Sequence, residues 1–269
     1  MAFDPQKYFE EDKTTYQGKR VVVYRFRDNL IGEFVSDFIL PFRLAYATDE
    51  EIMSGVERGY WDKKQGIANY LPTKPILKSG EFAEILVYFL SICFRCPDVN
   101  VYPLKWRWKE NQNTPMHLSD IAMAKCEDPK HPSEDDYLYF VESKARATTL
   151  PTVTTKSVMN DGILGALDDI VSRATKMITF LIVKFNKEKN YEMADRMNRF
   201  KETVEVKYER RFNAAIVVEN KSLDQHINNT TQENLDNAKR LGVELFAIPI
   251  ENMKDVYERV LTEALNTLE

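Results

Sequence analysis

Cysteine and glycine are scarce in this chain of 269 residues, which contains three cysteines and nine glycines. Three cysteines are too few, and odd in number, for the disulfide framework of a small secreted domain. With only 11 prolines, 12% aromatic and 43% hydrophobic residues, the composition is not that of a disordered chain. We therefore expect a folded protein with a sizeable core in a reducing compartment.

Long apolar stretches are also absent. The most apolar run, Phe82–Phe94, is interrupted and shorter than the roughly 18 residues that a membrane-spanning helix needs. Residues 1–19 are polar and charged and lack the apolar segment of an export signal. We expect a cytoplasmic protein that has no membrane partner.

An excess of positive charge is missing as well, because 37 basic residues face 42 acidic ones and the net charge is −5. A protein that coats DNA is usually basic, so this balance argues against tight autonomous binding of nucleic acid. It does not exclude a metal-dependent nuclease. Acidic metal ligands are themselves negative, and a partner subunit can supply the affinity for DNA.

The order of predicted elements indicates a mixed α/β fold. Strands are predicted over Arg20–Phe26, Val101–Lys109, His117–Lys125, Asp136–Arg146, Phe212–Glu219 and Val243–Ile250. Helices are predicted over residues 80–92, Gly162–Lys184, Lys187–Arg210, Thr231–Leu241 and Asn252–Leu268. The segment 29–70 gives no clear prediction. Because a helix joins the last two strands, we expect these strands to pair in parallel.

Three basic residues alternate with two tryptophans inside the predicted strand 101–109. They are Lys105, Arg107 and Lys109, with Trp106 and Trp108 between them. Exposed lysine and arginine side chains of this kind contact DNA phosphates in many complexes. A solvated strand face above a tryptophan-lined core gives the same pattern, and the sequence leaves both interpretations open.

The residues that suggest chemistry are Asp120, Glu142 and Lys144. Glu142 and Lys144 are two apart on one predicted strand, so their side chains share a face. Asp120 lies on the preceding strand, across a polar loop that predicts a hairpin. Carboxylates can hold Mg²⁺ while a lysine orients water or phosphate, so this combination suits phosphodiester hydrolysis. Leu138 and Phe140 share the face of Glu142, and charges that continue an apolar face need a functional reason.

The Glu-x-Lys spacing is not specific by itself. It also occurs at Glu11–Lys13, Glu205–Lys207 and Glu219–Lys221. The last of these ends a predicted strand and is the serious alternative, although no preceding strand presents an aspartate across a hairpin. For Glu142 and Lys144, the alternative is a salt-bridged pair on a sheet face without a catalytic role.

Three segments resemble the HamA effector family: Gly80–Glu84, His117–Ala124 and Tyr139–Ala145. HamA is the nuclease subunit of the bacterial Hachiman anti-phage system and has the Asp…Glu-x-Lys signature of PD-(D/E)xK nucleases. The resemblance implies a restriction-endonuclease-like core, with a mixed sheet and flanking helices, over residues 78–269. Residues 1–77 are then an N-terminal elaboration.

The same resemblance implies roles for individual residues. Asp120 and Glu142 bind Mg²⁺, with Mn²⁺ as an alternative, and Lys144 serves the attacking water or the phosphate. Glu84 is an additional acidic residue beside the metal. Ser119 stands where the family-wide signature has proline, at a permissive position.

The implied function is that of a deoxyribonuclease with little sequence specificity once activated, in a complex with a large helicase, HamB. Two alternatives remain open at this point. One is a non-catalytic subunit that scaffolds or regulates the helicase, and the other is a stand-alone restriction endonuclease.

Overall fold

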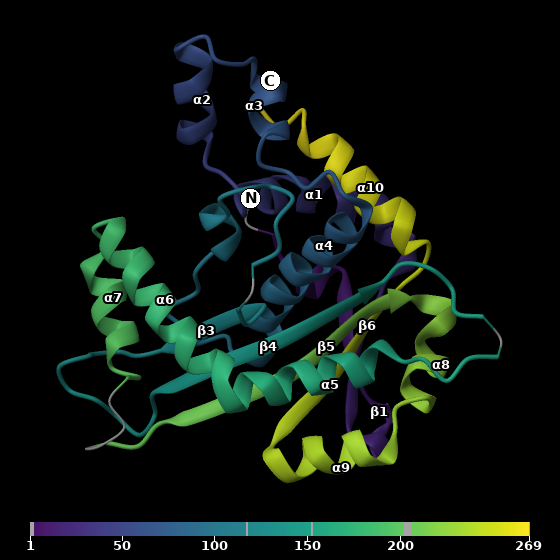
Figure 1. Ribbon diagram of the computed structural model, residues 1–269. Helices are drawn as coiled ribbons and strands as arrows, with labels where there is room; N and C mark the ends of the chain where they lie inside the picture. Colours follow the sequence, from purple (N-terminus) through teal and green to yellow (C-terminus); the bar gives the residue numbers. More distant parts are fainter. Residues whose placement is uncertain (1–2, 117, 152, 202–205, 269) are drawn as a thin grey trace.

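In the computed structural model, which describes residues 3–116, 118–151, 153–201 and 206–268, a six-stranded mixed sheet lies between layers of helices (Figure 1). The strand order is β1-β2-β6-β5-β4-β3. The strands are β1 (Phe9–Tyr16), β2 (Val21–Phe26), β3 (Ile121–Lys125), β4 (Tyr137–Arg146), β5 (Glu209–Glu219) and β6 (Val243–Ile250). The predicted α/β class and the mixed sheet with flanking helices are confirmed, and the arrangement is compatible with a restriction-endonuclease-like core.

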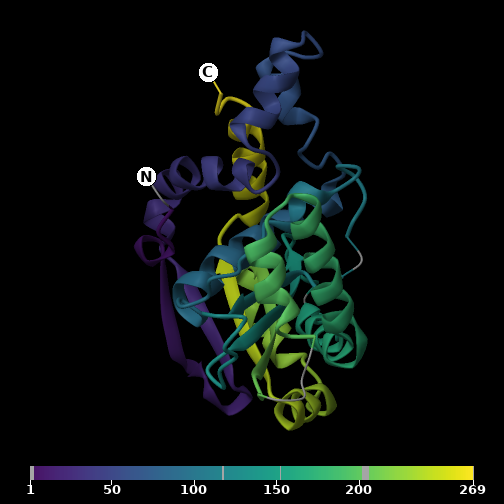
Figure 2. The same cartoon turned by 90° about the vertical axis from the view of Figure 1, so that its left-hand side faces the viewer.

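Helices cover both faces of this sheet. They are α1 (Ile31–Leu44), α2 (Asp49–Glu57), α3 (Lys63–Ala68), α4 (Pro75–Leu90), α5 (Val158–Asp168), α6 (Ala174–Lys187), α7 (Tyr191–Asn198), α8 (Leu223–Asn228), α9 (Gln232–Leu241) and α10 (Met253–Ala264). In Figures 1 and 2, α2 and α3 project away from the sheet beyond α1 and α10. Within the described residues, none of the helices combines the length and the apolar character needed to cross a membrane. The cytoplasmic location expected from the sequence stays a prediction.

Parallel pairing dominates the centre of the sheet. β5 pairs in parallel with both β4 and β6, as predicted for the last two strands, and β2 pairs in parallel with β6. β3 and β4 form the predicted antiparallel hairpin. Since β1 and β2 belong to residues 1–77, the predicted N-terminal elaboration contributes two strands to this sheet. The division of the chain at residue 78 stays a prediction.

Alternating side chains of β4 divide the core into two layers. Tyr139 and Val141 are buried in the layer that contains α1, α4 and α10, whereas Leu138 and Phe140 are buried in the layer that contains α5, α6 and α9. Burial of each such side chain contributes about 1.5–3 kcal/mol. β4 is therefore anchored from both sides, and Glu142 continues the face that α5 covers.

The predicted strand Val101–Lys109 is wrong. Val101 makes only an isolated bridge, and the following residues form the 3₁₀ turn η5 (Lys105–Trp108). Pro103 cannot donate a ladder hydrogen bond, which disfavours a continuous strand here. Lys105 and Trp106 are both buried, although a strand would place them on opposite faces.

Candidate active site

The candidate site lies where the edge strand β3 begins. Asp120 directly precedes β3, and because Ile121 pairs with Val141, Asp120 comes level with Glu142 on β4. The backbone N–H of Ser143 donates a hydrogen bond of 2.9 Å to Asp120 Oδ2. This bond fixes the Asp120 carboxylate against β4, as the predicted hairpin requires. The strand predicted from residue 117 is shorter than expected, and His117 lies outside the described residues.

Glu142 is buried between two cations on the α5 face of β4. Its side chain is 3% exposed, with Lys144 Nζ 2.5 Å from Oε1 and Arg173 Nη2 2.8 Å from Oε2. A buried carboxylate is tolerated only when it is paired in this way. Glu142 and Lys144 therefore share a face and touch, as their spacing predicted.

Helix α5 passes directly over Glu142 at Gly165. A Cβ atom at position 165 would lie 2.5 Å from Cγ, Cδ and Oε1 of Glu142, closer than real Cβ contacts allow. At Gly162, three residues earlier, the nearest atoms are Cβ of Ala214 at 3.6 Å and Cγ of Lys144 at 3.8 Å, which are ordinary contacts. Only glycine at 165 permits this approach. A glycine inside an apolar helix is the sequence feature that could have indicated it.

The π-helical turn η6 (Asp169–Arg173) joins α5 to α6 and adds a second acidic group to the site. Arg173 Nε lies 3.0 Å from Asp169 Oδ1, and the Ser119 hydroxyl donates to the same oxygen at 2.8 Å. Asp169 is 1% exposed, and its Oδ2 has no hydrogen-bond partner among the described residues. Asp169 thus links Ser119, the neighbour of Asp120, to Arg173, which is paired with Glu142. No sequence pattern indicated Asp169, although π-turns often occur at functional sites.

Glu84 reaches the site from α4, in the layer opposite α5. Its Oε2 accepts a hydrogen bond of 3.2 Å from Trp106 Nε1 and lies 3.1 Å from Lys105 Nζ. The same ammonium lies 3.8 Å from Asp120 Oδ1 and is only 5% exposed. Lys105 is therefore a buried cation that joins Glu84 to Asp120, and both interpretations of it as an exposed basic residue are wrong.

The other members of the basic series are also engaged within the protein. Arg107 donates to the backbone oxygen of Leu44 at 2.7 and 3.0 Å. Lys109 forms an ion pair with the buried Glu81, which also accepts a hydrogen bond of 2.9 Å from Tyr46. These contacts explain why the basic residues of this segment do not form an exposed strip.

Burial and mutual repulsion shift the protonation of the site. Burial raises the pKa of Glu84 to about 7, opposed by Lys105 and reinforced by Asp120. Burial and then Asp120 likewise raise the pKa of Glu142, opposed by Lys144. Burial lowers the pKa of Lys144, but Glu142 and Asp120 more than compensate and leave it above its ordinary value. Lys144 is therefore an ammonium at neutral pH, which suits contact with phosphate or water rather than abstraction of a proton.

The donor atoms of the site suit a hard divalent cation. Asp120 and Glu142 present carboxylate oxygens, and Mg²⁺ is usually held by one or two carboxylates together with substrate phosphate and water. Mn²⁺ accepts the same ligands. The described residues contain no group of three or more His, Cys, Asp or Glu side chains arranged to hold a metal, and Glu84 faces Lys105. Asp120 and Glu142 face cationic side chains as well, so Asp120, Glu142 and Glu84 all stay predicted metal ligands.

The competing Glu-x-Lys motif at Glu219–Lys221 has a structural role. The Glu219 carboxylate accepts hydrogen bonds from the backbone N–H groups of Asn252 at 3.3 Å and Met253 at 3.1 Å. Asn252 precedes α10 and lacks a side-chain cap of its own. Glu219 therefore caps this helix from the end of β5, where negative charge is favoured.

Replacing Asp169 with asparagine is expected to stabilise the protein increasingly as the pH rises. Burial raises the pKa of Asp169 to about 7 from an ordinary value near 3.8, so between these values the folded chain retains a proton that the unfolded chain has lost. Wild-type stability consequently falls as the pH rises through this window. Asparagine keeps Oδ1 as an acceptor and cannot ionise. Glu84 and Glu142 occur in both proteins, so their contributions to the pH dependence of stability largely cancel when the variant is compared with wild type.

Urea unfolding in EDTA at pH 5, 6, 7 and 8 measures this difference. From pH 5 to pH 8, the free energy of unfolding of Asp169→Asn should rise relative to that of wild type by about 2 kcal/mol. A difference that stays constant with pH would show that Asp169 is ionised throughout.

Comparison with known proteins identifies the family of the chain. No curated protein matches the sequence. A family model described as HamA matches residues 3–264. The match includes residues 3–77, so the family likeness extends beyond the core over residues 78–269 that the resemblance implied. The chain belongs to the HamA family, which links it to Hachiman anti-phage defence.

Proposed function

We propose that this protein hydrolyses phosphodiester bonds of DNA with Mg²⁺, as a PD-(D/E)xK nuclease and as the effector subunit of a helicase–nuclease complex. The observation that carries the proposal is the attachment of Asp120 to β4 beside the Glu142–Lys144 pair. An aspartate level with a Glu-x-Lys on the next strand is the arrangement that this chemistry requires. Membership of the HamA family supports the role in defence.

The side chains divide the work according to their contacts. A divalent cation held by Asp120 and Glu142 would act as a Lewis acid and lower the pKa of a bound water. The Lys144 side chain is 35% exposed, so its ammonium can reach a phosphate oxygen of a bound strand. Arg173 remains paired with Glu142 and Asp169. Glu142 therefore stays in position when Lys144 turns towards the substrate.

The proposed partner is a large helicase of the HamB type. A chain with a net charge of −5 has little general affinity for a polyanion, and phosphate contacts dominate that affinity. A helicase that binds and moves along DNA supplies it. We propose that cutting is restrained in the resting complex and becomes indiscriminate after activation.

Plasmid degradation by the wild-type protein, alone and with its helicase, tests this function. Cutting in Mg²⁺ should disappear in excess EDTA and return with added Mg²⁺ or Mn²⁺, because the carboxylates alone cannot activate water. A smear of products is expected, whereas discrete fragments would favour a restriction endonuclease. If no cutting occurs under any condition while the helicase is still bound, the protein is a scaffold subunit.

A further inference from the structure

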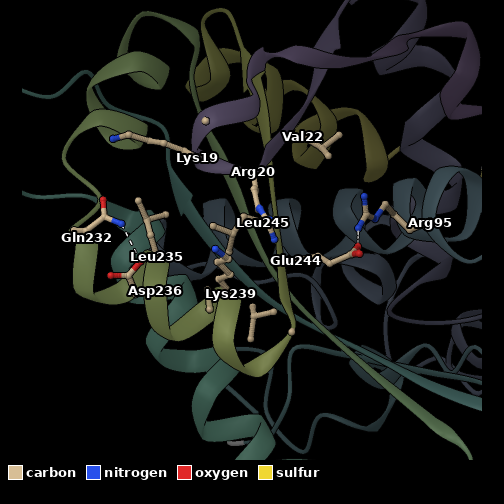
Figure 3. Close-up of a pocket in the computed structure, with 14 residues that line it drawn as sticks. Lys19, Arg20, Val22, Arg95, Gln232, Leu235, Asp236, Lys239, Glu244 and Leu245 are labelled. Carbon is tan, nitrogen blue, oxygen red and sulfur yellow. Dashed lines mark hydrogen bonds and ion pairs between the residues drawn. The ribbon is translucent and has the colours of Figure 1, made fainter.

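A hollow of about 480 Å³ lies between α9 and the turn η2 (Gln17–Lys19), beside the first residues of β6 (Figure 3). Its volume falls within the range of roughly 300–1,000 Å³ that is typical of small-molecule sites. None of the residues that line it belongs to the candidate active site. Binding here is therefore separable from the proposed nuclease activity.

The hollow is positively charged on a chain that is negative overall. Its lining includes four cationic side chains and two anionic ones. Two of the cations already have partners: Lys19 donates to the backbone oxygen of Ile227 at 2.9 Å, and Arg95 is paired with Glu244. The remaining acid, Asp236, accepts a hydrogen bond of 2.9 Å from Gln232. The two remaining cations are Arg20 and Lys239.

Arg20 and Lys239 form no ion pair with any residue in the described part of the chain. They border the hollow from two sides: Arg20 directly follows η2, and Lys239 lies on α9 (Figure 3). Arg20 has a φ of 54°, a left-handed conformation that few residues other than glycine adopt. Two like charges that border one hollow repel each other, and an anion between them would remove that repulsion.

We propose that this hollow binds the phosphate group of a nucleotide-sized molecule. The guanidinium of Arg20 can bind two phosphate oxygens at once, and the Lys239 ammonium adds a point charge. Val22, Leu235 and Leu245 offer an apolar wall for the rest of the molecule. The same phosphomonoester occurs on a free nucleotide and on the phosphorylated end of a DNA strand, so either is a possible source.

Isothermal titration calorimetry in EDTA, where metal-dependent cutting cannot occur, tests the site with inorganic pyrophosphate and dAMP. The double variant Arg20→Asn/Lys239→Gln removes both charges, and asparagine tolerates the left-handed backbone at position 20. Its dissociation constants should rise at least about tenfold. The control Arg240→Gln removes one charge from the same turn of α9 without altering the lining, and its constants should stay within about twofold of wild type.

Absence of saturable binding at millimolar concentration, or equal binding by wild type and the double variant, would overturn the proposal. Competition by a short oligonucleotide that carries a 5′-phosphate, but not by its unphosphorylated form, would assign the site to strand ends. Competition by neither would assign it to free nucleotides, and equal competition by both forms would refute recognition of a phosphomonoester.

Discussion

The Lys144→Met variant is expected to fold normally and to cut DNA about a hundred to ten thousand times more slowly than wild type. Methionine fills a similar volume without the charge, so the ammonium that we assign to the phosphate or the attacking water is lost. Glu142 keeps its ion pair with Arg173 at 2.8 Å, and the Lys144 side chain is 35% exposed. The free energy of unfolding should therefore fall by less than the roughly 3–5 kcal/mol that loss of the partner of a buried charge costs, because Arg173 still holds the carboxylate.

The chain supplies a matched control in its second strand-terminal Glu-x-Lys motif. Lys221→Met makes the same substitution two residues after Glu219, whose carboxylate caps α10. Plasmid degradation should continue at the wild-type rate in this variant. Equal loss of activity in both variants would indicate a general effect of charge on DNA binding, and unchanged activity in Lys144→Met would remove Lys144 from the catalytic site.

The central strands and the hairpin were predictable because their determinants are local. β6 is predicted at its observed boundaries, since Val243–Ile250 is apolar except for Glu244 and follows a glycine that ends α9. The polar loop before β4 predicted the antiparallel pairing that brings Asp120 level with Glu142. The period of two placed Glu142 and Lys144 on one face. These three features sufficed to locate the candidate site on the sheet.

The residues that complete the site were not predictable because their partners are distant in sequence. Lys105 pairs with Glu84, 21 positions earlier, and lies in a turn whose alternating pattern imitates a strand. Asp169 is linked to Ser119 from a π-turn that leaves no recognised sequence pattern. Both are charged residues whose burial depends on tertiary contacts. Residue type alone favours an exposed position for them.

Gly165→Ala is expected to reduce DNA cleavage at least about a hundredfold, because displacement of a catalytic group by about 1 Å has an effect of that size. The added Cβ would lie 2.5 Å from three atoms of Glu142, which cannot move freely because Lys144 and Arg173 hold its carboxylate. Overpacking of this kind costs about 1–3 kcal/mol, more than the roughly 1 kcal/mol that alanine gains over glycine inside a helix. The free energy of unfolding should therefore decrease.

Gly162→Ala, on the same helix, separates the effect of position from the effect of substitution. Its Cβ would make ordinary contacts at 3.6 and 3.8 Å, so the higher helix propensity of alanine should raise the free energy of unfolding by about 0.5–1 kcal/mol and leave cleavage unchanged. Urea unfolding and plasmid degradation of the two variants give the comparison. Similar behaviour of both would mean that α5 shifts to accommodate a methyl group. Changes of opposite sign in the free energy of unfolding, with cleavage lost only in Gly165→Ala, would mean that contact with α5 at Gly165 sets the position of the Glu142 carboxylate. The geometry of the site would then depend on a residue that has no side chain.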